Sequence, residues 1–218
     1  MPTSNRTAPG PKPTLVLLVR HGVTPTTGKL LPGRAPGLDL AEEGRAQASA
    51  VAEAIAAMEH PPVAVYASPM ERTRQTAAPI ARALGVRVRV VRELVECDVG
   101  DWTGARLRTV ARTAHWRNVH AWPGGFRFPA GESFPEMACR AQDAVVRLAG
   151  SHRGQTIVAV SHADPIKAVV ASASGTPLDL FQRFVISPCS VSAILYADDG
   201  PLVLCVNAES PPKGAVVS

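Results

Sequence analysis

Two histidines follow directly after short apolar runs. The run LVLLV at 15–19 leads into Arg20-His21-Gly22, and TIVAV at 156–160 leads into Ser161-His162. An unbroken apolar run of five residues is typical of a central strand in a parallel sheet, and ligands of such sheets bind beyond the carboxyl ends of the strands. If the two strands are neighbours, His21 and His162 emerge at one edge beside Arg20, whose planar guanidinium suits a phosphate or carboxylate. The alternative is that each histidine only caps its strand.

Three more residues extend this possible anion site. Gly22 would let the backbone approach a ligand closely, and Thr24 could donate a hydroxyl. Arg72 lies in SPMERTRQTA, four residues before Thr76, in the first turn of an expected helix. The start of a helix favours anions, so Arg72 there could bind one. The alternative is an arginine that only contacts solvent.

A fourth stretch, LVECDVGDWTG at 94–104, supplies carboxylates in a loop rich in Gly and Trp. Glu96 or Asp98 could act as a general acid if its surroundings keep it protonated. The spacing alone does not choose between them.

The elements that position these residues follow from hydrophobic periodicity. Apolar or β-branched runs predict strands, and apolar residues near a 3.6-residue spacing predict helices. Ser68 and Pro69 are expected to be the N-cap and the first residue of the second helix. We predict strands at 15–19, 63–66, 86–91, 156–160, 191–196 and 202–206, and helices at 41–58, 70–84, 135–149 and 165–174.

Alternating strands and helices predict a three-layer α/β/α fold with a mostly parallel central sheet. The last two strands are expected to form an antiparallel pair. Residues 14–209 contain no low-complexity linker and no repeat, which favours one domain. Residues 1–13 and 210–218 are rich in proline and are expected to be disordered tails.

Composition narrows the function classes. The chain has 218 residues and a formal net charge of +5, but three cations lie in the expected tails, which leaves +2 for residues 14–209. A body so close to neutral does not favour nucleic acid as a partner. No run approaches the roughly 18 apolar residues of a membrane span, and the N-terminus lacks the apolar core of a signal peptide. We therefore expect a cytoplasmic protein that binds neither nucleic acid nor membrane.

The four cysteines are widely separated and form neither a C-x-x-C pair nor a Cys/His ligand spacing. Buried, reduced thiols are the expected state, ahead of disulfides or a metal site. No metal and no cofactor are predicted.

Six motifs occur in an order that resembles the histidine phosphatase superfamily, the phosphoglycerate mutase-like group. The resemblance spans roughly residues 15–196 and is strongest to actinobacterial members described as phosphomutases or acid phosphatases. The motifs are RHG at 20–22, LDLAEEGRAQ at 38–47, SPMERTRQTA at 68–77, LVECDVGDWTG at 94–104, GES at 131–133 and VAVSHAD at 158–164.

The resemblance implies a phosphoglycerate mutase-like fold and a role for each candidate. His21 would be the nucleophile that becomes a phosphohistidine, and His162 would contact the transferring oxygens. Arg20 and Arg72 would bind those oxygens, and Glu96 would be the proton donor, with Asp98 an accessory or structural residue.

In related phosphatases Thr24 and the backbone around Gly33 and Arg34 also line the pocket. The expected partner is a small phosphorylated substrate.

The sequence departs from the mutases of this superfamily. After Gly22 it reads VTPTTG, without the Ser, Trp and Asn of those enzymes, and the mutase insertion is hard to place in 218 residues. Hydrolysis is therefore favoured over phosphate transfer between substrates. A relative without catalysis that binds phosphorylated ligands is a further alternative, which the retained histidines, arginines and Glu96 disfavour.

Substrate choice is expected to lie in Arg106–Pro129. This segment would be a lid that brings arginines, histidines and indoles to the substrate, or else a surface segment with incidental arginines. Its candidate residues are Arg108, Arg112, His115, Trp116, Arg117, His120, Trp122 and Arg127. Edge strands near the C-terminus could support a homodimer.

Overall fold

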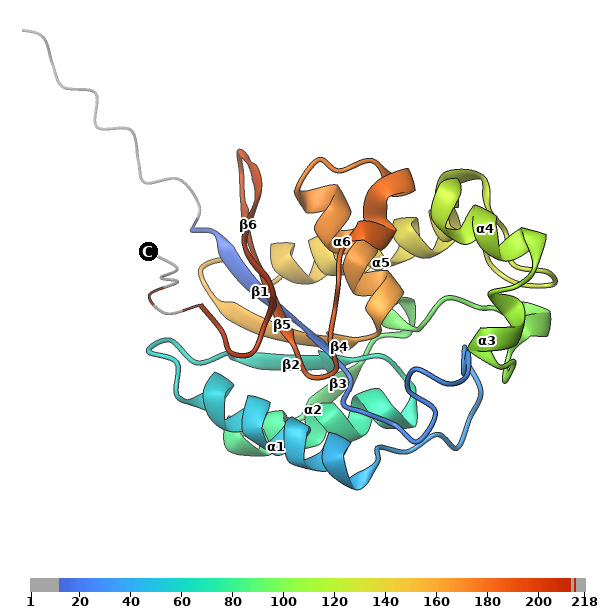
Figure 1. The fold of residues 1–218 in the computed structure, drawn as a ribbon. Coiled ribbons are helices and arrows are strands. Elements are labelled where there is room, and N and C mark those ends of the chain that lie inside the picture. The colour runs from blue at the N-terminus through green and yellow to red at the C-terminus, as the bar shows by residue number, and fades with distance from the viewer. Residues whose placement is uncertain (1–11, 213, 215–218) are drawn as a thin grey trace, which may run out of the picture.

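The computed structural model describes residues 12–212 and 214 (Figure 1). Its centre is a six-stranded sheet with the order β3-β2-β4-β1-β5-β6. The strands β1 to β4 are parallel, whereas β5 is antiparallel to β1 and to β6. The strands are β1 (Thr14–Arg20), β2 (Ala64–Ala67), β3 (Val88–Val90), β4 (Thr156–Ser161), β5 (Val191–Ala197) and β6 (Gly200–Ala208).

Helices cover both faces of this sheet. Helices α1 (Glu42–Ala56) and α2 (Glu71–Ala83) lie on one face, and α5 (Phe134–Gly150) and α6 (Ala163–Ala173) lie on the other (Figure 1). The predicted three-layer fold with a mostly parallel sheet is therefore confirmed.

Strand β1 shows why its apolar run has no alternation. Leu17 packs with Ile55 and Ile80 in the core under α1 and α2. Its neighbour Leu18 points the other way and packs with Val145 in the core under α5 and α6. A strand covered on both faces buries every side chain, and an apolar residue at each position stabilises it.

A third core lies beside the carboxyl ends of the parallel strands. Here the segment 100–129, which we call the cap segment, contributes Phe126 and Phe128 to an aromatic cluster that also includes Phe134 and Phe181. The ring centroids of Phe126 and Phe128 lie 4.9 Å apart, nearly perpendicular, which is a favourable aromatic geometry. The cap segment contains α3 (Leu107–Val110), α4 (Ala114–Ala121) and the 3-10 helices η2 (Gly100–Trp102) and η3 (Pro123–Gly125); η1 (Arg92–Leu94) and η4 (Leu178–Arg183) lie outside it.

Several predicted boundaries need correction. Ser68 is not the N-cap of α2, because Met70 holds that position and the helix begins at Glu71. The strand predicted at 86–91 shortens to three residues at the edge of the sheet. The predicted tails fall largely on residues 1–11, 213 and 215–218, which lie outside the described residues, so that prediction stays open.

The cysteines and the helix lengths test two further expectations. All four cysteines are free, and Cys97 and Cys189 are buried as predicted, but Cys139 is exposed and Cys205 is only half-buried. The expectation of four buried thiols is therefore wrong for two of them. Within residues 12–212 and 214, no helix has both the length and the apolar character needed to cross a membrane.

Candidate active site

The parallel pairing of β1 and β4 brings the two histidine motifs together. Arg20 is in register with Ser161, and the backbone N–H of His21 donates to the Ser161 carbonyl at 3.0 Å. The imidazole centroids of His21 and His162 lie 5.2 Å apart, with the rings inclined by 65°. The expectation that both side chains emerge at one sheet edge is confirmed.

His21 is held in one tautomer. Its Nδ1 lies 2.8 Å from the Gly22 carbonyl oxygen. Because a carbonyl only accepts, Nδ1 carries the proton and Nε2 keeps its lone pair. Desolvation, followed by the charges of Arg72 and Arg20, lowers the pKa of His21 to about 3. The imidazole is therefore neutral at neutral pH, with a nucleophilic nitrogen.

His162 is fully buried and is held by Ser68. The Ser68 hydroxyl lies 2.8 Å from His162 Nε2 and accepts a longer bond from the Met70 N–H. His162 Nε2 is the only acceptor recorded for that hydroxyl among the described residues, so we assign Ser68 as the donor, which places the proton of His162 on Nδ1. That Nδ1 has no hydrogen-bond partner in the described part of the chain. Burial lowers the pKa of His162 well below its ordinary value, so the imidazole is neutral.

Two arginines accompany the imidazoles: Arg72 is buried, and Arg20 is partly exposed. Arg72 is 0% exposed, and its Nη2 donates to the Gly33 carbonyl at 2.8 Å. Arg20 Nη1 donates to the Ile186 carbonyl. Across residues 12–212 and 214, neither guanidinium pairs with a carboxylate, and Arg72 Nε, Arg72 Nη1 and Arg20 Nε have no partner.

The environment of the two arginines bears on the role of Arg72 and favours an anionic ligand. Burial lowers the pKa of both arginines, yet a guanidinium stays protonated at any physiological pH. The idea that Arg72 merely contacts solvent is wrong. Buried, charged donors without a carboxylate are costly unless an anion binds them, and a phosphoryl group offers matching oxygens.

Glu96, and not Asp98, faces this group. Glu96 lines the cavity beside His21, and its Oε1 accepts a hydrogen bond from the Cys97 N–H at 2.9 Å. Desolvation, with repulsion from Asp164 second, raises the pKa of Glu96 to about 7. Asp98 instead accepts from the Gly100 N–H and lies 3.6 Å from an Arg34 nitrogen. Of the two carboxylates that the sequence left open, only Glu96 borders the cavity beside His21.

The backbone of Glu96 is fixed by two arginines. Arg34 Nε and Arg140 Nη2 donate to the Glu96 carbonyl at 2.9 and 3.1 Å. Both arginines also bind the Glu132 carboxylate, each at 2.8 Å. Gly33 and Arg34, expected to line the pocket, therefore support Arg72 and Glu96 from behind and do not border the cavity.

The cavity beside His21 has a volume of about 500 Å³. We call it the His21 cavity. Arg20, Thr24 and Glu96 border it, while Arg72 and His162 are fully buried. Apolar and polar walls complete it: Leu107, Trp116, Val119, His120 and Phe128 come from the cap segment, and Asp164, Lys167 and Gln182 come from α6 and η4.

The predicted lid residues divide into two sets. Trp116 and His120 border the His21 cavity, as expected of substrate-facing residues, and Arg108 borders a neighbouring cavity. The others border neither cavity: Arg112, His115, Arg117, Trp122 and Arg127, of which Arg127 pairs with Glu136.

Gly22 and Thr24 have structural partners of their own. A Cβ on Gly22 would lie 2.5 Å from the Gly44 carbonyl oxygen, so close packing on α1 explains the glycine. The Gly22 N–H donates to Thr76 Oγ1 at 3.1 Å. The Thr24 hydroxyl is 3.0 Å from that of Thr27, and Thr24 borders the cavity.

Sequence reasoning missed Ser68 as a partner of His162. The signal was present, since Ser68 follows the buried strand β2, and β2 pairs with β4 in the sheet. Its hydroxyl therefore reaches the same edge. In the part of the chain that the structure describes, no group of three or more His, Cys, Asp or Glu side chains is arranged to hold a metal ion.

Comparison with known proteins assigns the family. The profile of the histidine phosphatase superfamily (branch 1) matches residues 16–209. The chain belongs to this superfamily. The match covers nearly all of the described residues, including both histidine motifs.

Two relatives of this histidine phosphatase domain have names that state an activity. Phosphoserine phosphatase 1 of Hydrogenobacter thermophilus is 30% identical over 198 residues, which is 88% of this chain and 91% of the relative. A metal-independent phosphoserine phosphatase of Arabidopsis thaliana is 36% identical over 168 residues, covering 72% and 67% of the two chains.

A solved structure confirms the fold. Mycobacterial glucosyl-3-phosphoglycerate phosphatase superposes with a TM-score of 0.81 at 23% identity, covering 90% of this chain and all of that one. The phosphoglycerate mutase-like fold expected from the motifs is therefore correct.

Proposed function

We propose that the chain is a phosphomonoesterase that hydrolyses a small phosphorylated substrate through a covalent phosphohistidine on His21. One observation carries the proposal. A neutral His21 with its lone pair on Nε2 lies beside His162, Arg20 and Arg72. Of their buried nitrogens, His162 Nδ1, Arg20 Nε, Arg72 Nε and Arg72 Nη1 have no partner among the described residues. These groups suit an oxyanion in transfer.

The first step forms the phosphohistidine. His21 Nε2 attacks phosphorus, the P–N bond forms as the P–O bond to the leaving group breaks, and Glu96 gives its proton to the departing oxygen. Arg20, Arg72 and the Nδ1–H of His162 stabilise the charge on the equatorial oxygens. A pKa of about 7 leaves Glu96 partly protonated at neutral pH, which suits a general acid.

The second step releases phosphate. A water attacks phosphorus as the P–N bond breaks, and the Glu96 carboxylate takes the proton of that water. His21 returns to its neutral form, with Nδ1 still bound to Gly22, and Glu96 is protonated for the next cycle. The positive charge needed in both steps comes from side chains of this chain, so we propose metal-independent hydrolysis.

The alternative within the superfamily is a phosphomutase, in which a hydroxyl of a second substrate replaces water. The sequence departures after Gly22 favour hydrolysis. A catalytically weak relative that only binds phosphorylated ligands is the other alternative, and the pKa of Glu96 disfavours it. The names of the relatives support a small phosphorylated metabolite as substrate, phosphoserine among the candidates. A cytoplasmic location and a homodimer remain part of this proposal.

The test is release of p-nitrophenol from p-nitrophenyl phosphate in the presence of EDTA, with wild type beside His21→Ala. We expect turnover in the wild type and its loss in the variant. Equal turnover in both would contradict the phosphohistidine. No turnover in either would favour the mutase or the binding protein, and adding a second phosphate acceptor would separate those two.

A further inference from the structure

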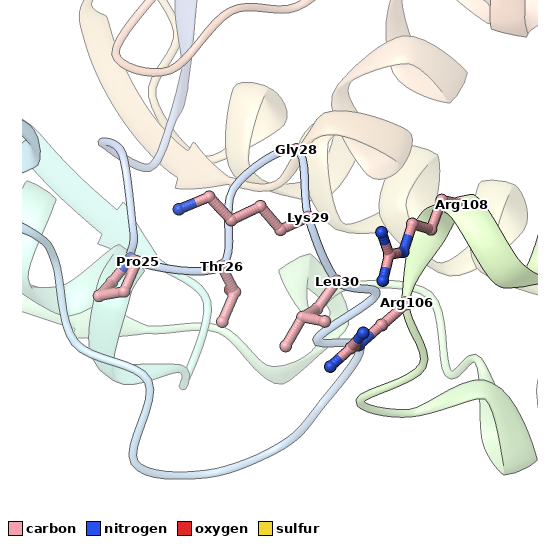
Figure 2. A pocket seen from close by; sticks show the side chains of 7 residues that line it. All are labelled: Pro25, Thr26, Gly28, Lys29, Leu30, Arg106 and Arg108. Carbon is pink, nitrogen blue, oxygen red and sulfur yellow. The ribbon is translucent and has the colours of Figure 1, made fainter.

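A second cavity, of about 460 Å³, adjoins the His21 cavity. The two share Thr26, Gly28 and Leu30 as a common wall. Figure 2 shows the second cavity, to which Pro25, Lys29, Arg106 and Arg108 also contribute. We call it the cationic cavity.

The lining of the cationic cavity carries positive charge only. Lys29, Arg106 and Arg108 border it, and no carboxylate does. Within the described ranges, none of these three side chains forms an ion pair or a side-chain hydrogen bond. Cations gathered in a cleft repel one another and raise the local concentration of anions, so a bound anion would stabilise the arrangement.

Backbone hydrogen bonds hold the two segments of the cationic cavity together. Leu30 and Arg106 form an antiparallel bridge, and the Leu107 N–H donates to the Lys29 carbonyl at 3.0 Å. In Figure 2 the Lys29 side chain extends past Thr26 toward Pro25. The guanidinium groups of Arg106 and Arg108 lie at the opposite end of the cavity, near Leu30. The backbone therefore fixes the positions from which the three exposed side chains extend.

We propose that Lys29, Arg106 and Arg108 bind a second anionic group, a carboxylate or a phosphate, of the substrate whose phosphoryl group is transferred at His21. The common wall favours one molecule that reaches both cavities over two separate ligands. This inference rests on the proposed function and adds to it a substrate class, the phosphomonoester that carries another negative charge.

The experiment compares ligands that differ in that charge alone. One pair is 3-phosphoglycerate and glycerol 3-phosphate, in which a carboxylate replaces a hydroxymethyl group. The other is propane-1,3-diol bisphosphate and its monophosphate. Dissociation constants are measured calorimetrically on His21→Ala, which cannot form the proposed intermediate, and kcat/KM is measured on the chain with His21 intact.

Each measurement is repeated with Lys29, Arg106 and Arg108 changed together to glutamine. Arg112→Gln is the matched control, because Arg112 is an exposed arginine of the same segment that borders neither cavity. The three cation positions and Arg112 are exposed, and circular dichroism checks that all the variants fold.

We expect the chain to bind the anionic member of at least one pair tenfold or more tightly than its partner. The triple variant should reduce this preference to less than threefold, and Arg112→Gln should keep it. The pair that shows the preference identifies carboxylate or phosphate. Equal binding within both pairs, no binding of any ligand, or a preference that survives the triple variant would overturn the inference.

The two proposals fail in different ways. Hydrolysis that His21→Ala abolishes, without any charge preference, would remove the second anion site and leave the phosphatase. A charge preference in binding without hydrolysis by the wild type would leave the site and remove the phosphatase.

Discussion

Glu96→Gln should stabilise the folded protein at alkaline pH. Burial raises the pKa of Glu96 from 4.5 to about 7, so the folded state favours the protonated carboxyl. Stability from this group is fully present below pH 4.5 and is lost as pH rises through about 7. At about 1.36 kcal/mol for each pH unit, ionisation of Glu96 costs roughly 3 kcal/mol of unfolding free energy above pH 8. Glutamine has the same shape, keeps the bond from the Cys97 N–H, and never ionises.

The assay is urea denaturation of wild type and Glu96→Gln at pH 4.5 and pH 8.5. We expect the variant to gain about 2 to 3 kcal/mol at pH 8.5 and almost nothing at pH 4.5. Glu53→Gln, at an exposed position on α1, is the control and should show no such difference. Asp164→Asn should reduce the gain, because Asp164 is the second cause of the raised pKa. A gain independent of pH, or a loss at pH 8.5, would refute the reasoning.

Three further predictions concern rate and packing. With an alkyl phosphate substrate, kcat/KM should fall above pH about 7 as Glu96 loses the proton it donates, which a pH–rate profile measures. Ser68→Ala should lower kcat about tenfold or more with little change in KM, because His162 Nε2 loses its donor and Nδ1 no longer keeps the proton; steady-state kinetics checks this. Gly44→Ala should destabilise the fold by about 1 to 3 kcal/mol in urea denaturation, because its Cβ would lie 2.1 Å from the Val23 carbonyl oxygen.

Each of these three predictions would be contradicted by a specific result. A flat profile up to pH 9 would remove Glu96 as the acid. For Ser68→Ala, an unchanged kcat, or a loss confined to KM, would show that the serine does not position His162. Wild-type stability in Gly44→Ala would mean that α1 shifts freely against the loop after β1.

That the two histidines lie side by side could be predicted from the apolar runs that precede them. Unbroken apolar runs before His21 and His162 required burial on both sides, and such strands occupy the centre of a parallel sheet. The burial of Arg72 was less accessible. Its helix position was visible in the sequence, but its hydrogen bond to the Gly33 carbonyl joins it to a loop 39 residues earlier in the chain.

The remaining features depend on contacts between segments far apart in the chain. Nothing local distinguishes Glu96 from Asp98. The difference is visible only in the fold, where Glu96 borders the His21 cavity and Asp98 lies beside Arg34. Ser68 lies just before a helix, and serine is favoured as an N-cap, so the sequence predicted that role. In the structure its hydroxyl bonds to His162, which follows a different strand. The role of Lys29 could not be predicted from the sequence either. It lines the same cavity as Arg106 and Arg108 only because Leu30 and Arg106 form a bridge in the fold.

The central claim is the covalent intermediate on His21, and trapping it is the most direct test. Wild type and Glu96→Gln would be mixed with p-nitrophenyl phosphate, quenched in base, where phosphohistidine persists, and mapped by peptide mass spectrometry. The account predicts one phosphoryl group on His21, more abundant in Glu96→Gln because its second step lacks a base, and none in His21→Ala. Turnover by the wild type with His21 unmodified in both proteins, or a phosphoryl group on another residue, would contradict it.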